Sequence, residues 1–326
     1  MKQRSIFCLT LAFVAVTSLT AKTKTDAYLF AYFTGNAPQQ EQICYAISDD
    51  GWNYKPLNNG QPIIASKKIA RTGCVRDPHI LRGEDGWFYM VATDMKSSLG
   101  WTSNRGIVLM RSKDLVKWKS STVHFPDRFP GTMFEHVTRV WAPQTLYDER
   151  TGRYIVYFSI LTDDGSCPYD RVYWAYTNRD FTDIEGIPHL LFDMRTASID
   201  TDIVKDDNGL LHVFFKTEGS RRKGIKQFIA KDFYDGRTWE LQPGWCQDTD
   251  KQVEGSGVFR LHDGSWVLMY DCYTSGHYQF CKSNDLKTFQ KVQDTKTQGT
   301  FTPRHGTVIG ITSKEKKRLM RAFPSH

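Results

Sequence analysis

The sequence has no long apolar run after its first residues, no zinc-type cysteine spacing and almost no helical periodicity. Apart from Ile6–Val16, no segment approaches the ~20 apolar residues that a membrane-spanning helix requires. No Cys-x-x-Cys pair or Cys/His cluster has the spacing of a zinc site. Basic residues are dispersed despite a formal net charge of +7, and the one dense run, Lys314–Arg318, is typical of a solvated terminal helix. These absences argue against a membrane, zinc or nucleic-acid-binding protein.

The start of the chain has the layout of a secretory signal. Lys2 and Arg4 precede the short apolar run, and small residues follow it at Ser18–Ala21. We therefore expect residues 1–21 to be a signal peptide and residues 22–326 to form a single exported domain, periplasmic or extracellular.

The chain has few cysteines for a fold that depends on disulfide bonds. Of the seven cysteines, Cys8 lies in the expected signal, which leaves six for the mature chain. An oxidising compartment permits disulfides, and Cys272 and Cys281 flank an expected hairpin, so a bridge between them is one alternative. A core of this size does not need one.

Short strand patterns are abundant and they repeat. An aromatic strand pattern follows an Asx/Gly turn or opens the series in five places: Tyr28–Phe33, Trp87–Val91, Tyr154–Phe158, Leu211–Phe215 and Trp266–Tyr270. An Asp-containing turn with a following aromatic ends each unit: Ile47–Trp52, Arg111–Trp118, Thr177–Phe181, Ala230–Phe233 and Lys282–Phe289. Five such units predict an all-β fold, a five-bladed β-propeller.

Polar residues stand where the inner strand of each unit is expected to begin. These starts recur at nearly regular intervals, at Asp77, Ala142–Gln144, Asp200, Glu254 and His305. Radial repetition should bring them around one axis. The last run, starting at His305, has no full unit after it, so we expect it to complete the blade begun by residues 28–57 and close the ring.

Three of these starts are carboxylates: Asp77, Asp200 and Glu254. Hydrolysis of a glycosidic bond needs one carboxyl as acid and one as base, and a neighbouring anion can raise the acid's pKa. From spacing alone, several acids on a propeller axis are equally compatible with a bound metal or polar ligand. A single Asp or Glu at such a place is more often a turn residue.

Five motifs occur in order along the mature chain: Arg76–Ile80, Trp141–Gln144, Ser198–Asp200 leading into Asp206–Gly209, Val253–Phe259 and Arg304–Ile309. With them the chain resembles glycoside hydrolase family 43, five-bladed propeller enzymes that act on plant-wall polysaccharides. The resemblance implies an inverting mechanism in which Asp77 is the general base, Glu254 the general acid and Asp200 the residue that tunes and orients the acid.

Three positions need comment against that family. Gln144 is assigned to substrate binding; many members have an acidic residue at its position, so substrate contacts from that blade should differ. Asp202 could share a face with Asp200 by strand alternation and is the reserve for its role. His305 is similar to a histidine that lies near a hydrated calcium or other cation. The alternative is a histidine bonded within the closing strand, and no cofactor is required.

Aromatic side chains stack on sugar faces, and some should line the site. Trp141 begins an inner strand and is expected to form a wall of the −1 subsite. Trp101, Phe134 and Tyr278 fall in expected loops or strand ends and are assigned to outer subsites. The long segment Ser120–Arg139 is a candidate rim.

Two basic residues are also expected at the site. Arg304 would hold a sugar hydroxyl or the acid's partner. Lys216, with Glu218 two residues later, should end its strand near the channel and support an ionised Asp200, although a surface ion pair is an alternative.

The function indicated is hydrolysis at the side chains or ends of plant cell-wall polysaccharides containing arabinose, xylose or galactose. The resemblance favours an α-L-arabinofuranosidase, with β-xylosidase (xylan degradation) or exo-β-1,3-galactanase next. The other class is a non-catalytic carbohydrate-binding propeller. A retaining fructosidase-type propeller is discounted because residues 22–60 contain no Asn-Asp-Pro motif.

Overall fold

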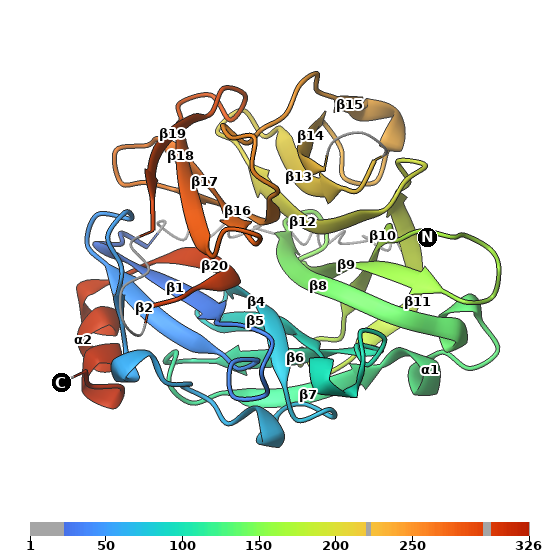
Figure 1. The fold of residues 1–326 in the computed structure, drawn as a ribbon, viewed down its shortest axis with the longest axis horizontal. Helices are drawn as coiled ribbons and strands as arrows, with labels where there is room; N and C mark the ends of the chain where they lie inside the picture. Colours follow the sequence, from blue (N-terminus) through green and yellow to red (C-terminus); the bar gives the residue numbers. More distant parts are fainter. Residues whose placement is uncertain (1–22, 220–222, 296–300, 326) are drawn as a thin grey trace, which may run out of the picture.

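The computed structural model describes residues 23–219, 223–295 and 301–325. In these residues five four-stranded antiparallel sheets surround a common axis, and Figure 1 looks down the ring that they form. This confirms the predicted all-β, five-bladed propeller. The expected signal, residues 1–21, lies outside the described residues.

Each blade runs from an inner strand at the ring axis to an outer strand at the rim (Figure 1). The blades, inner strand first, are β20 (Arg304–Ile311), β1 (Ala27–Phe33), β2 (Cys44–Ser48) and β3 (Lys55–Pro56); β4 (Val75–Arg82), β5 (Phe88–Asp94), β6 (Gly106–Ser112) and β7 (Lys119–His124); β8 (Val137–Asp148), β9 (Arg153–Thr162), β10 (Arg171–Thr177) and β11 (Ile184–Phe192); β12 (Ser198–Lys205), β13 (Leu211–Thr217), β14 (Gly224–Ala230) and β15 (Trp239–Leu241); β16 (Glu254–Arg260), β17 (Trp266–Cys272), β18 (His277–Ser283) and β19 (Gln290–Asp294).

The first blade joins the two ends of the described chain. Strand β20 pairs antiparallel with β1, with Leu29 opposite Ile309. The prediction that the last run completes the first blade is therefore confirmed. This pairing gives β20 a place in the sheet of β1–β3 and closes the ring between its first and last strands.

The core lies between adjacent blades, because each sheet is covered on both faces by its neighbours. All seven residues of β1 are buried, which explains the continuous apolar runs in the sequence. Aromatic rings meet across the blades. The Phe30 and Tyr278 ring centroids, for example, lie 5.7 Å apart in a T-shaped contact. Tyr278 is fully buried, so its assignment to an outer sugar subsite was wrong.

The Ser120–Arg139 segment is anchored by the core rather than forming only an open rim. It contains the helices α1 (Phe125–Arg128) and η4 (Met133–His136). The ring of Phe134 is 2% exposed and packs edge-on against Tyr173, with 5.4 Å between centroids. The prediction that Phe134 contacts substrate was therefore wrong, because η4 turns this ring inward.

The described cysteines are all free. Cys272 and Cys281 do not bridge because the register of β17 and β18 separates them. Cys272 lies opposite His277, and Cys281 lies opposite Leu268.

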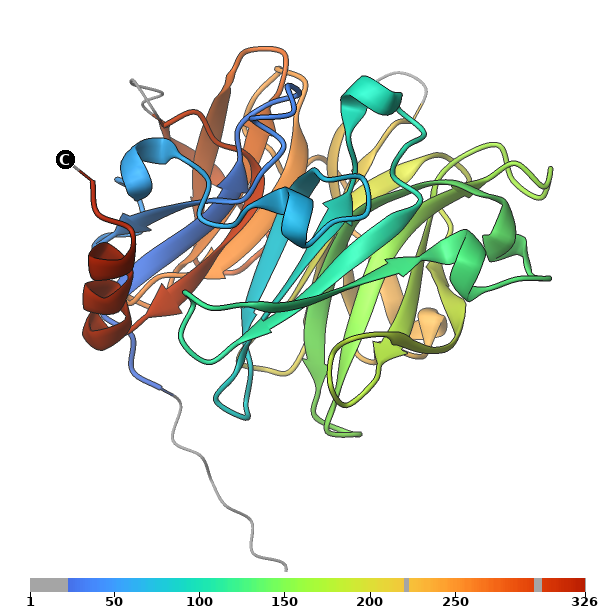
Figure 2. The same cartoon turned by 90° about the horizontal axis from the view of Figure 1, so that it is seen from below.

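Helix α2 (Ser313–Ala322) carries the basic run and lies outside the first blade (Figures 1 and 2). Thr312 and Glu315 form a capping box at its start, and Leu319 is buried against the blade. Arg82 binds Glu315 and ties the helix to the second blade. The expected terminal helix is thus present.

The remaining helices are the single turns η1 (Asn58–Gly60), η2 (Ser66–Lys68), η3 (Ser97–Leu99) and η5 (Gly236–Thr238). In the part of the chain that the structure describes, no helix has the length and apolarity needed to cross a bilayer.

Candidate active site

A β-bulge interrupts each of the inner strands β4, β8, β12 and β16 near the residues singled out from the sequence. One residue at each bulge has left-handed backbone geometry: Asp77 (φ 52°), Ala142 (φ 44°), Asp200 (φ 54°) and Gly255 (φ 64°). Aspartate tolerates this region better than most residues, and glycine tolerates it best. A bulge changes the direction of the side chains around it. The same backbone feature therefore sets the direction of side chains in each of these four blades.

Side chains of the neighbouring blades satisfy backbone N–H groups just beyond the bulges. The N–H of Ile203 donates to the Tyr157 hydroxyl at 3.1 Å. The N–H of Val258 donates to Oδ2 of Asp202 at 2.6 Å. Burial raises the pKa of Asp202 to about 7, although the Val258 N–H favours its ionised form. Asp202 therefore links two blades, and it does not line the pocket described next.

The inner strands begin around a pocket of about 320 Å³. It brings together the three carboxylates predicted from the sequence with both tryptophans, the arginine and the histidine. Its lining residues are Asn36, Arg76, Asp77, Trp101, Trp141, Ile199, Asp200, Glu254, Tyr273, Arg304 and His305.

His305 lies between two of the carboxylates. Its Nδ1 is 3.4 Å from Oδ1 of Asp77 and 3.7 Å from Oδ1 of Asp200. Burial disfavours the charged imidazolium, but the carboxylates of Asp200 and Asp77 outweigh burial and raise the pKa of His305 to about 9. The ring is therefore a cation at neutral pH.

Asp77 is held in its ionised form. Its side chain is buried, which opposes ionisation, but hydrogen bonding and charge from His305 outweigh burial and keep its pKa below the ordinary value. Arg76 contributes charge, and the Thr93 hydroxyl donates to Oδ2 of Asp77 at 2.8 Å. The same hydroxyl accepts from the N–H of Ala142 at 3.0 Å and so connects two bulges.

Asp200 is held by the bulge of the next blade. The N–H of Gly255 donates to its Oδ2 at 2.8 Å. Burial raises the pKa of Asp200 to about 6, with His305 opposing and the Glu254 charge adding to the rise. Only glycine fits at position 255, because a Cβ there would lie 2.8 Å from Cγ of His305.

Glu254 contacts two cations from different blades. Nζ of Lys216 is 3.0 Å from its Oε2, and Nη2 of Arg304 is 3.1 Å from its Oε1. Arg304 also binds Asp271, and Lys216 binds Glu218 at 2.7 Å. Lys216 is buried, which excludes the surface-pair alternative. It contacts Glu254, and its charge also favours the ionised form of Asp200, as expected. Arg304 was expected to hold either a sugar hydroxyl or the partner of the acid, and the contact observed is with Glu254, the proposed acid.

Two of the predicted contacts lie elsewhere or lack support. Gln144 is buried and does not line the pocket; the Tyr157 hydroxyl donates to its Oε1 at 3.1 Å. Its assignment to substrate binding was therefore wrong, because the residue lies past the β8 bulge. The water-held cation expected near His305 stays a prediction, and Nδ1 of this ring faces the carboxylates of Asp77 and Asp200. The described residues contain no group of three His, Cys, Asp or Glu side chains placed to hold a metal ion.

Several residues at or beside the site could not be assigned a role from the sequence. Arg76 lies in the quoted motif, and its guanidinium stacks 4.7 Å from the Phe33 ring centroid and 5.3 Å from that of Trp101. Asp271 directly follows the aromatic strand pattern and faces Glu254 across the β16–β17 ladder. Nothing in the sequence pattern distinguished Asn36 or Tyr273.

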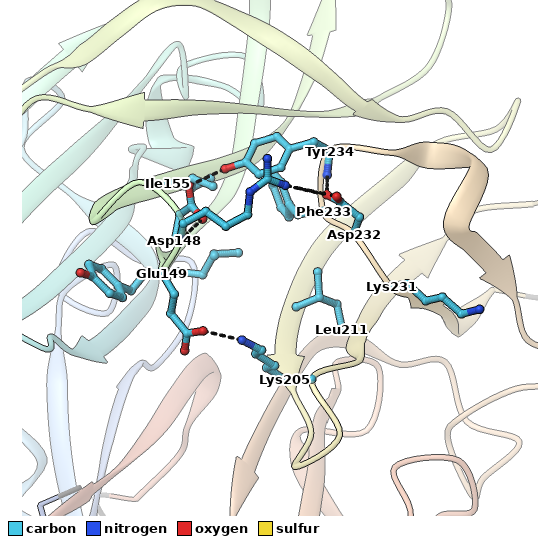
Figure 3. A pocket seen from close by; sticks show the side chains of 13 residues that line it. Asp148, Glu149, Ile155, Lys205, Leu211, Lys231, Asp232, Phe233 and Tyr234 are labelled. Carbon is cyan, nitrogen blue, oxygen red and sulfur yellow. Dashed lines mark hydrogen bonds and ion pairs between the residues drawn. The ribbon is translucent and has the colours of Figure 1, made fainter. Parts of the chain in front are cut away.

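A second pocket, of about 190 Å³, lies where β8 and β12 end, away from the starts of the inner strands (Figure 3). Neighbouring side chains bind its carboxylates. Glu149 binds Lys205 at 2.6 Å, and the Tyr234 hydroxyl donates to Asp148 at 2.7 Å. This second pocket contains none of the residues predicted from the sequence for the site, so the pocket around Asp77 is the better candidate for catalysis.

Residues 23–317 match a family related to glycoside hydrolase family 43 and described as a "probable glycosyl hydrolase domain". An α-L-arabinofuranosidase of Bifidobacterium longum is 28% identical over 253 residues, which is 67% of this chain but 22% of that protein. The chain thus spans about a fifth of that relative's length.

Solved structures support the fold. An endo-arabinase from Bacteroides thetaiotaomicron superposes with a TM-score of 0.58 at 16% identity, covering 85% of this chain and 92% of that one. An exo-β-1,3-galactanase from Clostridium thermocellum gives 0.53 at 15% identity, covering 71% and 50%. The match over nearly the whole described chain, on a five-bladed ring with carboxylates at its axis, shows that this protein belongs to the family 43-related glycoside hydrolases.

Proposed function

We propose that this protein is an inverting glycoside hydrolase that removes arabinose units from the side chains or ends of plant cell-wall polysaccharides, as an α-L-arabinofuranosidase. The observation that carries the proposal is the meeting of Asp77, Asp200 and Glu254 in one pocket with unlike surroundings. The matched relative named an α-L-arabinofuranosidase supports the choice of sugar.

The surroundings suit distinct roles. Asp77, kept ionised, takes a proton from a water molecule, and the water oxygen attacks the anomeric carbon. Glu254 gives its proton to the glycosidic oxygen, which leaves as an alcohol. Asp200 shares His305 with Asp77 and adds negative charge near Glu254, which favours the protonated acid. An inverting pair needs about 6.5–9.5 Å between its carboxyls, and for Asp77 and Glu254 this stays a prediction.

The pocket walls suit a sugar ring. The Trp101 and Trp141 ring centroids lie 6.4 Å apart, and Trp101 is 55% exposed. Aromatic faces of this kind offer apolar surface to the C–H face of a sugar. The basic and small-residue pattern of residues 1–21 supports export to the periplasm or the medium as part of the proposal.

Of the two runners-up, the exo-β-1,3-galactanase among similar structures favours a galactose-releasing enzyme on the same catalytic groups, and a β-xylosidase is the other. A panel of nitrophenyl α-L-arabinofuranoside, β-D-xyloside and β-D-galactoside, followed by proton NMR of the first anomer released from an oligosaccharide, tests the proposal. We expect arabinose with inverted configuration. Release of the retained anomer would overturn the mechanism. Binding of oligosaccharides without any cleavage would indicate a carbohydrate-binding propeller instead.

A further inference from the structure

The contacts of Glu254 raise a question about its proposed role as the acid. Two cations touch its carboxyl group, Lys216 on one oxygen and Arg304 on the other. Opposite charges within ~4–6 Å favour the ionised form of a carboxyl group. An acid that must carry a proton before it donates needs something that offsets these two charges.

Each cation has a second carboxylate of its own. Glu218 binds Lys216 at 2.7 Å but is partly exposed and also binds Lys223. Asp271 binds Nε of Arg304, and its side chain is 0% exposed. Asp271 is also the direct cross-strand partner of Glu254. The buried carboxylate therefore lies beside the acid, with Arg304 joining the two.

A purely structural ion pair with Arg304 does not account for the surroundings of Asp271. Its Oδ1 is buried and has no hydrogen-bond partner among the described residues, although two bonds to a guanidinium would satisfy it better. Burial raises the pKa of Asp271 to about 6, with Arg304 opposing, so the group is ionised at neutral pH. It does not line the pocket and cannot act on the substrate directly.

The charges around Glu254 decide what Asp271 does. With Glu254 protonated, Lys216 and Arg304 are balanced by Glu218 and Asp271. Without the charge of Asp271, the same state has a net charge of +1, which favours loss of the proton from Glu254. The remaining charged neighbours are the same in both cases: His305, Asp200 and Asp77 across the pocket, and the half-exposed Lys223 beside Glu218.

We propose that Asp271 is a positioning residue for Glu254: its buried carboxylate orients the Arg304 guanidinium and cancels its charge, so that Glu254 keeps the proton that it gives to the departing sugar oxygen. This inference rests on the proposed function, in which Glu254 is the general acid.

The test uses Asp271→Asn, which keeps the shape of the side chain and removes its charge. We expect the basic limb of the kcat/KM–pH profile on an arabinoside with a poor leaving group to move down by about one pH unit. Carbon-13 NMR of labelled glutamate carboxyls, with the Glu254 signal assigned by its loss in Glu254→Gln, should show the same downward shift without any turnover.

Arg304→Gln should shift the Glu254 titration upward, because it leaves Asp271 unpaired. The double variant Arg304→Gln/Asp271→Asn should then return it toward the wild-type value. Comparing these two variants keeps the test available if Asp271→Asn alone does not fold. The matched control is Asp263→Asn. Asp263 is exposed in the turn between β16 and β17 and binds Lys282, so its replacement should leave the titration of Glu254 unchanged.

An unchanged Glu254 titration in folded Asp271→Asn, or a double variant that titrates like Arg304→Gln, would overturn the role of Asp271. A wild-type protein that cleaves no glycoside would instead reject the proposed function, and the general-acid role with it. The two failures are therefore distinguishable.

Discussion

Nδ1 of His305 lies 3.4 Å from Oδ1 of Asp77, so the inner strand of the first blade holds the proposed base of the second. The same nitrogen lies 3.7 Å from Oδ1 of Asp200. One buried cation thus serves two carboxylates that the proposed reaction uses differently.

This arrangement should make folding stability depend on pH. The pKa of His305 is raised from 6.5 to about 9, so its stabilising effect is fully present below about pH 6.5 and declines as the pH rises through 9. Urea unfolding of wild type and His305→Gln from pH 6 to 10 measures it. We expect the difference in unfolding free energy to shrink across that range. His189→Gln, at an exposed position, is the control, and a difference that is constant with pH would contradict the prediction.

Replacing the proposed base should remove hydrolysis of every substrate. Asp77→Asn cannot accept the water proton, and a general base contributes about 10²–10⁴-fold. We expect kcat to fall by that factor on both nitrophenyl glycosides and oligosaccharides, with a wild-type far-UV spectrum. Full turnover by Asp77→Ala would remove Asp77 from the mechanism.

Replacing the proposed acid should instead discriminate between leaving groups. Glu254→Gln cannot protonate the glycosidic oxygen, so we expect a loss of about 10²–10⁴-fold on oligosaccharides. A dinitrophenyl glycoside, whose leaving group needs little protonation, should lose much less. Steady-state kinetics on the two substrates checks this, and equal losses would assign Glu254 another role.

Trp101 should contribute binding rather than chemistry. Its exposed ring faces the pocket with Trp141, and an aromatic contact is worth about 0.5–1.5 kcal/mol. Trp101→Ala should therefore raise KM for an oligosaccharide about two- to tenfold with kcat nearly unchanged. Leu99→Ala removes an exposed apolar side chain from the same loop and is the matched control. Unchanged KM in Trp101→Ala would exclude Trp101 from the substrate-binding surface.

Gly255 should be intolerant of a side chain for two separable reasons. Gly86→Ala tests the positive φ alone, since nothing lies near it, and should cost about 1 kcal/mol or more. Gly255→Ala adds a contact with His305 and should cost about 2–4 kcal/mol. Gly236→Ala, which has neither problem, is the neutral control. Urea unfolding measures all three, and equal losses for Gly86→Ala and Gly255→Ala would show that His305 moves aside.

The ring and its closure could be predicted because strand and turn patterns are local and repeat along the chain. The meeting of Asp77, Asp200 and Glu254 followed from that repetition. The bulges could not be predicted, because a positive φ at Asp200 depends on its register with β13 and on donors from β16. Register also separates Cys272 from Cys281.

Contacts between residues distant in sequence could not be predicted either. Asp271 acquires its importance only through Arg304, which is distant in sequence. Phe134 looked like a loop aromatic, but the turn η4 buries it in the core. A pattern of residue types does not show which side of such a turn faces inward.

Strand β20 leaves the ribosome after every other strand of the ring, and it carries both Arg304 and His305. A nascent chain can therefore stack four blades while Asp77 still lacks its imidazole and Glu254 its guanidinium. We expect the order of translation to withhold catalytic competence until synthesis of the propeller is finished.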